Sequence, residues 1–178
     1  ITGAYHGINA AANAGSDRIT VESSELFGNS QTGATIAGGN NDILFNANEV
    51  YQNGSWGLNL NGSGNRATGN HVWGNGGGIA ASYNGQDARI EILDNRVHDN
   101  NATGIDGSYW VLVSGNTVYG NGGSYGISMY SDRSLTIGNE IFRSPNGLNL
   151  SVGAVGRDNH IYDNAGLGIA LGGGGRAV

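Results

Sequence analysis

A four-residue motif recurs seven times along this chain and constrains its fold more than any other feature. An Asn, or once a Ser, is followed two residues later by Val, Ile or Leu and then at once by a ring. A second Asn follows two residues after the ring, with Ser144 as the exception. The copies are Ser24–Phe27, Asn48–Tyr51, Asn70–Trp73, Asn95–His98, Asn116–Tyr119, Asn139–Phe142 and Asn159–Tyr162. Such a repeat predicts a solenoid of stacked turns.

A second signal, Gly followed by an apolar residue, sets the length of one turn. It recurs from Gly7-Ile8 to Gly168-Ile169 at spacings of 26, 24, 21, 26, 22, 21 and 21 residues, a mean of 23. This is too short for a βαβ unit or for the common helical repeats. A leucine-rich repeat has a similar period, but its Leu spacing is absent.

Each repeat holds three short runs that alternate between apolar and polar residues, which predicts strands. Examples of the three runs are Gly57–Asn61, Ile90–Ile92 and the segment around each motif's Val or Ile. Three parallel strands per turn make a β-helix, so we expect an all-β, right-handed parallel β-helix of about seven coils. Residues 1–178 form a single domain in this interpretation.

Alternation also assigns the two faces of each strand. The apolar residue before each ring is predicted to point inward, and so is the residue after each Gly. The motif Asn residues are placed at corners, where the side chain tolerates a left-handed backbone and bonds to nearby main-chain groups. Stacked amides are also expected to bond to one another.

Composition excludes several classes of function. The net charge is −6 and all eight cationic side chains are Arg, which argues against non-specific binding of nucleic acid. With no Cys, neither a disulfide nor a thiolate metal site is possible. No apolar stretch is long enough for a membrane span.

Both ends of the chain fall partway through a coil, and no polar cap precedes the first one. Repeat proteins need caps, and open strand edges invite pairing. We therefore expect either an excerpt of a longer protein or ends that stack on a neighbouring copy.

The Asn-x-Val-Tyr-x-Asn … Gly-Ile pattern resembles the right-handed β-helix repeats of the pectate-lyase-like superfamily, which include NosD-like proteins and mannuronan C5-epimerases. The resemblance covers Gly7 to Gly172. It implies the fold, an extracellular location and, in many members, contact with acidic polysaccharide. The catalytic motifs of these enzymes are missing: no Asp-Pro-His, Gly-His-Gly or Arg-x-Lys occurs. No site is carried over, because fold alone does not give function.

In polysaccharide-active relatives the outward face of the first strand forms the groove. Here that face is small and polar, with Asn59 and Asn149 among its residues and Asp106 as its only carboxylate. A candidate catalytic group follows: Arg133 to neutralise a uronate, Tyr130 as base or acid, and Asp106 to orient substrate or hold a cation. The alternative is a solvated face with one turn Asp and one surface Arg.

The rings of the seven motifs are predicted to form one outward row, called the ring row. An exposed apolar stripe of this length is typical of a contact surface for sugars, for a partner or for neighbouring coils. Mutual stacking that stabilises the coil is the alternative. The members are Phe27, Tyr51, Trp73, His98, Tyr119, Phe142 and Tyr162.

Metal binding has weak support in the sequence. His71 and His160 share an outer face but are too far apart to share an ion. Calcium is possible at turn clusters such as Asn40-Asn41-Asp42, although no EF-hand loop is present. No other cofactor is indicated.

Two functions remain open. The first is an extracellular, secreted or cell-surface scaffold that contacts polysaccharide or self-associates, end to end or laterally. The second is part of a polysaccharide lyase or C5-epimerase, with Asp106, Tyr130 and Arg133 at its site.

Overall fold

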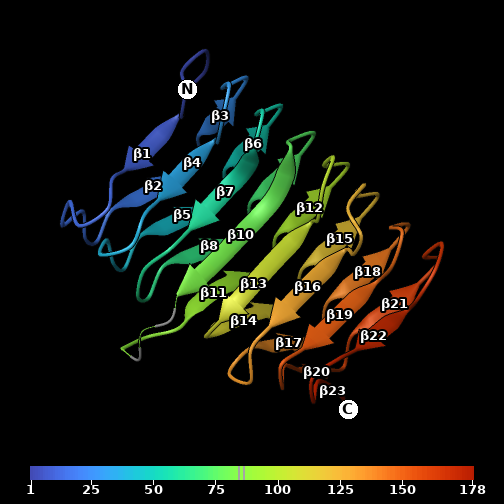
Figure 1. Ribbon diagram of the computed structural model, residues 1–178. Coiled ribbons are helices and arrows are strands. Elements are labelled where there is room, and N and C mark those ends of the chain that lie inside the picture. The colour runs from blue at the N-terminus through green and yellow to red at the C-terminus, as the bar shows by residue number, and fades with distance from the viewer. Residues whose placement is uncertain (84, 86) are drawn as a thin grey trace.

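The computed structural model, which describes residues 1–83, 85 and 87–178, is a parallel β-helix with eight turns rather than seven (Figure 1). The strands of the described residues form three sheets, and each strand pairs with its equivalent in the next turn. None of these residues forms a helix, so none lies in one that could cross a membrane.

The first sheet faces the viewer in Figure 1, the second lies below it and the third above it. The first sheet contains β1 Ile8–Ala10, β4 Ala34–Ile36, β7 Trp56–Leu60, β10 Gly77–Tyr83, β13 Ile105–Tyr109, β16 Ile127–Tyr130, β19 Leu148–Ser151 and β22 Ile169–Leu171. The second contains β2 Thr20–Glu22, β5 Leu44–Asn46, β8 Arg66–Thr68, β11 Ile90–Leu93, β14 Val111–Ser114, β17 Leu135–Ile137, β20 Val155–Arg157 and β23 Arg176–Ala177. The third contains β3 Glu25–Phe27, β6 Glu49–Tyr51, β9 His71–Trp73, β12 Arg96–His98, β15 Thr117–Tyr119, β18 Glu140–Phe142 and β21 His160–Tyr162.

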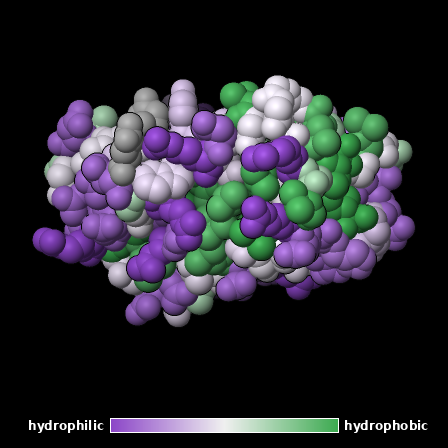
Figure 2. All heavy atoms as spheres, turned by 90° about the horizontal axis from the view of Figure 1, so that it is seen from below, coloured by the Kyte–Doolittle hydropathy of each residue, from purple (hydrophilic) through white to green (hydrophobic). Residues whose placement is uncertain are grey.

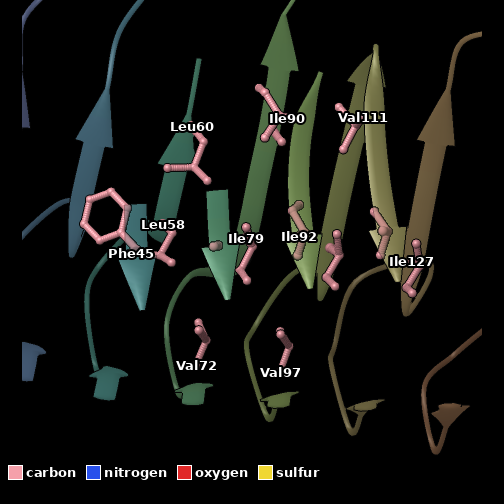
Figure 3. Packing of buried hydrophobic residues seen from close by; sticks show 14 of the residues in the cluster. Phe45, Leu58, Leu60, Val72, Ile79, Ile90, Ile92, Val97, Val111 and Ile127 are labelled. Carbon is pink, nitrogen blue, oxygen red and sulfur yellow. The ribbon is translucent and has the colours of Figure 1, made fainter. Parts of the chain in front are cut away.

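The predicted inward residues form the core, as Figure 3 shows for one stretch of the coil. Leu58 and Leu60 from the first sheet, Ile92 from the second and Val97 from the third are all fully buried. Each occupies one column that continues from turn to turn. In β22, Ile169 and Leu171 hold the same column positions and are exposed.

The recurring Gly has a packing role. A Cβ on Gly33 would lie 2.6 Å from the carbonyl oxygen of Gly57 and 2.8 Å from the side chain of Val50. Gly57 meets Val72 and Asn75 in the same way. The turns approach so closely at this point that no larger residue fits.

Two buried ladders of Asn side chains run along the coil, as expected. In each step one amide donates to the amide oxygen of the next turn, for example Asn70 to Asn95 at 2.9 Å and Asn53 to Asn75 at 2.9 Å. One feature of the expectation is wrong: the left-handed residue is not the Asn but its predecessor, for example Asp94 before Asn95. The extended Asn is thereby free to aim its amide along the stack.

The second sheet reverses the inside–outside pattern from β17 onward. In β17 the inward position belongs to Thr136, whereas Leu135 and Ile137 face outward and are half-buried. The register places Leu135 beside Leu112 on one side and Val155 on the other. Figure 2, which views the molecule from below, shows apolar atoms gathering on this side toward the C-terminal half.

Candidate functional site

A sharp corner between the first and second sheets carries a group of aromatic and charged side chains. Only Trp110 separates β13 from β14, so the chain turns within one residue. Tyr109 makes this turn with φ +65°, a conformation that side chains other than Gly and Asn seldom adopt. The turn leaves the Tyr109 side chain 50 % exposed.

The next turn of the helix completes the corner. Ser131, Asp132 and Arg133 follow β16 directly, and the Arg133 guanidinium lies 5.7 Å from the centre of the Trp110 ring. This distance allows a cation–π contact, and Arg is favoured over Lys for it. Trp110 therefore holds an exposed cation in place.

Two hollows meet at this cation–aromatic pair. The first has a volume of about 210 Å³, and a second, shallower one of about 540 Å³ extends over Leu135 on the second sheet. Trp110, Asp132 and Arg133 line both. We call this the corner pocket; the first hollow is lined by Tyr83, Gly85, Tyr109, Trp110, Ser131, Asp132 and Arg133.

Of the three residues predicted as catalytic, Arg133 lines the corner pocket, whereas Asp106 and Tyr130 lie on β13 and β16 outside its lining. Asp106 and Tyr130 face outward on neighbouring strands, where Asp106 aligns with Ser128 and Tyr130 with Ser108. Within the described residues no hydrogen bond or ion pair links Asp106, Tyr130 and Arg133. Tyr130 is exposed, whereas burial raises the pKa of the half-buried Asp106.

The predicted polar contacts on the same face differ in accessibility. Asn149 is buried and donates to the Ser128 hydroxyl at 3.0 Å, so little of it is open to a ligand. Asn59 is half-buried and accepts from Asn61 at 3.3 Å. The predicted groove therefore offers few accessible polar groups near Asn59, and polar side chains concentrate at the corner pocket.

The ring row forms one continuous stack. Ring centroids are 4.5 to 4.9 Å apart with nearly parallel planes, except for 6.3 Å between Trp73 and His98. Tyr119 is buried and the other members are half-buried. Because each ring covers the face of the next, the stack offers mainly edges to the outside.

The sequence indicated Arg133 as a site residue but not the pocket that Tyr109 and Trp110 form beside it. The pocket forms because the two turns place Tyr83 and Arg133 on either side of Trp110, and this depends on loop geometry. Calcium remains a prediction: no group of three or more His, Asp or Glu able to hold an ion occurs in the part of the chain that the structure describes. Asn40 of the predicted cluster instead bonds to backbone carbonyls.

Comparison with known families identifies the architecture. The family model described as "Right handed beta helix region" matches residues 1–137 and 104–178, which together span the whole chain. The chain belongs to this family. No curated protein matches it in sequence.

Among solved structures, the A-module of mannuronan C-5 epimerase AlgE4 from Azotobacter vinelandii is similar to this right-handed β-helix, with a TM-score of 0.70 and 17 % sequence identity. The match covers 91 % of this chain and 56 % of that one. At this identity the likeness shows the shared fold. The chain spans little more than half the length of that module.

Proposed function

We propose that this β-helix binds acidic polysaccharide through the corner pocket, as part of a secreted or cell-surface protein. The observation that carries the proposal is the Arg133 guanidinium held over the Trp110 ring between two hollows. Aromatic faces beside a few placed polar groups are typical of small-ligand sites. An Arg fork matches a carboxylate, the group that distinguishes a uronate from a neutral sugar.

The exposed tyrosines extend this surface. Tyr109 lies at the pocket, and Tyr130 stands on the first sheet beside it, 43 % exposed. Tyr109 and Tyr130 lie on adjacent strands, so a chain of sugars lying across the turns would meet both, with Arg133 beside them. The other outward side chains of the first sheet are small and polar, so they leave space for a polymer to lie along this face.

Asp132 beside Arg133 modifies the expected binding. Its exposed carboxylate lines the same hollow and would repel a uronate that approached from that side. Calcium, a hard cation that prefers carboxylate oxygens, would remove this repulsion by bridging the two. We therefore expect calcium to strengthen binding and a chelator to weaken it.

Isothermal titration with oligouronides tests the proposal. Arg133→Gln and Trp110→Leu should each weaken binding about tenfold or more, while neutral glucan oligomers should bind poorly to every form. Arg143→Gln is the matched control, because Arg143 lies over the ring-row members Tyr119 and Phe142 at similar distances. Equal losses in Arg143→Gln, or no binding at all, would contradict the proposal.

A second candidate, uronate epimerisation or β-elimination, is favoured by the raised pKa of Asp106 on the groove face. In this function Arg133 would neutralise the carboxylate, Tyr130 would transfer the proton at C5 and Asp106 would orient the sugar. Product NMR after incubation with alginate or pectate distinguishes the candidates. Unsaturated ends or inverted C5 signals that Asp106→Ala abolishes would establish the enzyme.

The ring row remains a proposed contact surface for self-association. Its stacked rings leave edges for a neighbouring coil, and sedimentation of a Trp73→Ser variant, compared with the parent chain, would detect that use.

A further inference from the structure

Two histidines meet on the outside of the third sheet, away from the corner pocket. His71 in β9 and His98 in β12 lie on adjacent turns, and their Nε2 atoms are 2.7 Å apart. His71 belongs to the row before the rings and His98 to the ring row, so they meet diagonally. The pair is accessible, with side-chain exposures of 31 % and 12 %.

The other nitrogen of each ring faces a carboxylate. His71 Nδ1 lies 3.0 Å from Glu49 Oε2, and His98 Nδ1 lies 2.8 Å from Asp99 Oδ2. A carboxylate oxygen accepts hydrogen bonds, so each Nδ1 carries the proton of its ring. In two neutral rings, both Nε2 atoms then present lone pairs toward the same point.

Two lone pairs 2.7 Å apart repel unless a positive species lies between them. We propose that His71 and His98 bind a borderline divalent metal ion, Cu²⁺ most tightly, through their Nε2 atoms. Imidazole nitrogen suits Cu²⁺, Ni²⁺ and Zn²⁺, and Cu²⁺ leads the affinity order. Carboxylates on Nδ1 are the usual partners of metal-binding histidines, because they fix the tautomer and strengthen the ligand.

The surrounding structure permits the ion to enter. Metal–nitrogen bonds of about 2.0 Å at the 90° angle of tetragonal Cu²⁺ place neighbouring nitrogens about 2.8 Å apart, so the rings need to separate by only about 0.1 Å. The ring row is widest here, at 6.3 Å between Trp73 and His98, which leaves room for that shift. Water would complete the coordination, since two protein ligands are available.

The local charges also suit a cation. Glu49 and Asp99 place two carboxylates beside the pair, against the single positive charge of Arg96, whose Nε donates to the Tyr119 hydroxyl at 2.9 Å. The neutral imidazole, which the two Nδ1–carboxylate contacts permit, is the form that binds metals.

His160 provides a matched control within the same chain. It lies over Tyr162 at 4.6 Å and 32°, much as His71 lies over Trp73 at 4.2 Å and 31°. Within the described residues no second histidine contacts it. A metal that prefers any exposed histidine would not distinguish His160 from His71.

The test is a Cu²⁺ titration of protein without an affinity tag, by calorimetry and by electron paramagnetic resonance. We expect one ion per chain with two nitrogen ligands. His71→Thr, which copies Thr117 of the same row, and His98→Phe, which copies Phe142, should each weaken binding about tenfold or more, and His160→Thr should not. Circular dichroism confirms folding of each variant. The proposal would be overturned if no stoichiometric Cu²⁺ binding occurred, or if all three variants lost affinity equally.

Discussion

At the scale of single residues, the coil depends on polar side chains buried under strict hydrogen-bonding rules. Among the described residues, Thr136 Oγ1 and Ser144 Oγ are the buried side-chain atoms without a partner. Ser144 interrupts the second Asn ladder between Asn121 and Asn164, although its own backbone N–H still donates to Asn164 at 3.1 Å. The other turns, which carry Asn at the ladder position of Ser144, therefore show which hydrogen bonds Ser144 does not make.

Ser144→Asn should stabilise the protein by completing the ladder. Its amide oxygen would accept from Asn121 as the other steps do, which adds about 1 kcal/mol and raises Tm by about 2–4 °C. Thermal unfolding measures the gain. Ser24→Asn is the control, because within the described residues no amide donates to position 24, so this variant adds one step of its ladder where Ser144→Asn adds two. A gain in Ser24→Asn as large as that in Ser144→Asn would contradict the ladder explanation.

Asp106 should make stability depend on pH. Burial raises its pKa in the folded protein, so the folded state holds the proton more tightly than the unfolded state. Its contribution is complete below the unfolded pKa, about 3.9, and is lost as pH rises through the folded value. Asp106→Asn should thus raise the urea midpoint at pH 7 and less so near pH 4. The exposed Asp158→Asn should show no such trend.

Replacing Tyr109 should affect the stability of the protein and its binding of oligouronides differently. Its left-handed backbone is strained, so Tyr109→Gly should leave the free energy of unfolding unchanged or raise it by up to about 1 kcal/mol. Oligouronide binding should weaken because an exposed ring leaves the corner pocket. Urea titrations measure the stability of the variant, and calorimetric titrations measure its affinity for oligouronides. A lower stability with unchanged affinity would contradict this prediction.

At the scale of elements, the three strands of each turn differ in what surrounds them. The third sheet carries the stacked ring row on its outside and the two Asn ladders at its ends, so it is the most regular. The second sheet is the least regular, because β17 turns the half-buried Leu135 and Ile137 outward and buries Thr136.

Tyr119→Leu should test the ring row as a structural element. It removes stacking on His98 and Phe142 and the hydroxyl that Arg96 contacts. We expect a loss of about 2 kcal/mol in the free energy of unfolding, although the replacement is also apolar. Tyr5→Leu, at an exposed ring outside the row, should cost little. Similar losses would show that stacking adds nothing beyond burial.

The repeats predicted these elements because their physical causes are local. Period, inward columns and ladders follow from residues such as Val97 and Asn95, whose positions recur in every turn. The β17 reversal departs from the pattern because Leu135-Thr136-Ile137 alternates correctly but in the opposite phase. Only the register with Val113, which aligns with Thr136, determines that phase.

At the scale of the whole molecule, the site was only partly predictable. The sequence placed Asp106, Tyr130 and Arg133 in one region, but the contact of Arg133 with Trp110 depends on the corner conformation. The meeting of His71 and His98 depends on side-chain rotamers.

The three tryptophans report separately on where the polysaccharide binds. Trp110 lies in the corner pocket, Trp73 in the ring row and Trp56 at the start of β7. The measurement is the shift of each indole N–H in an NMR titration with a mannuronate oligomer. Binding at the corner pocket should move the Trp110 signal and leave those of Trp73 and Trp56 unchanged. A shift of Trp73 alone, or of none, would contradict it.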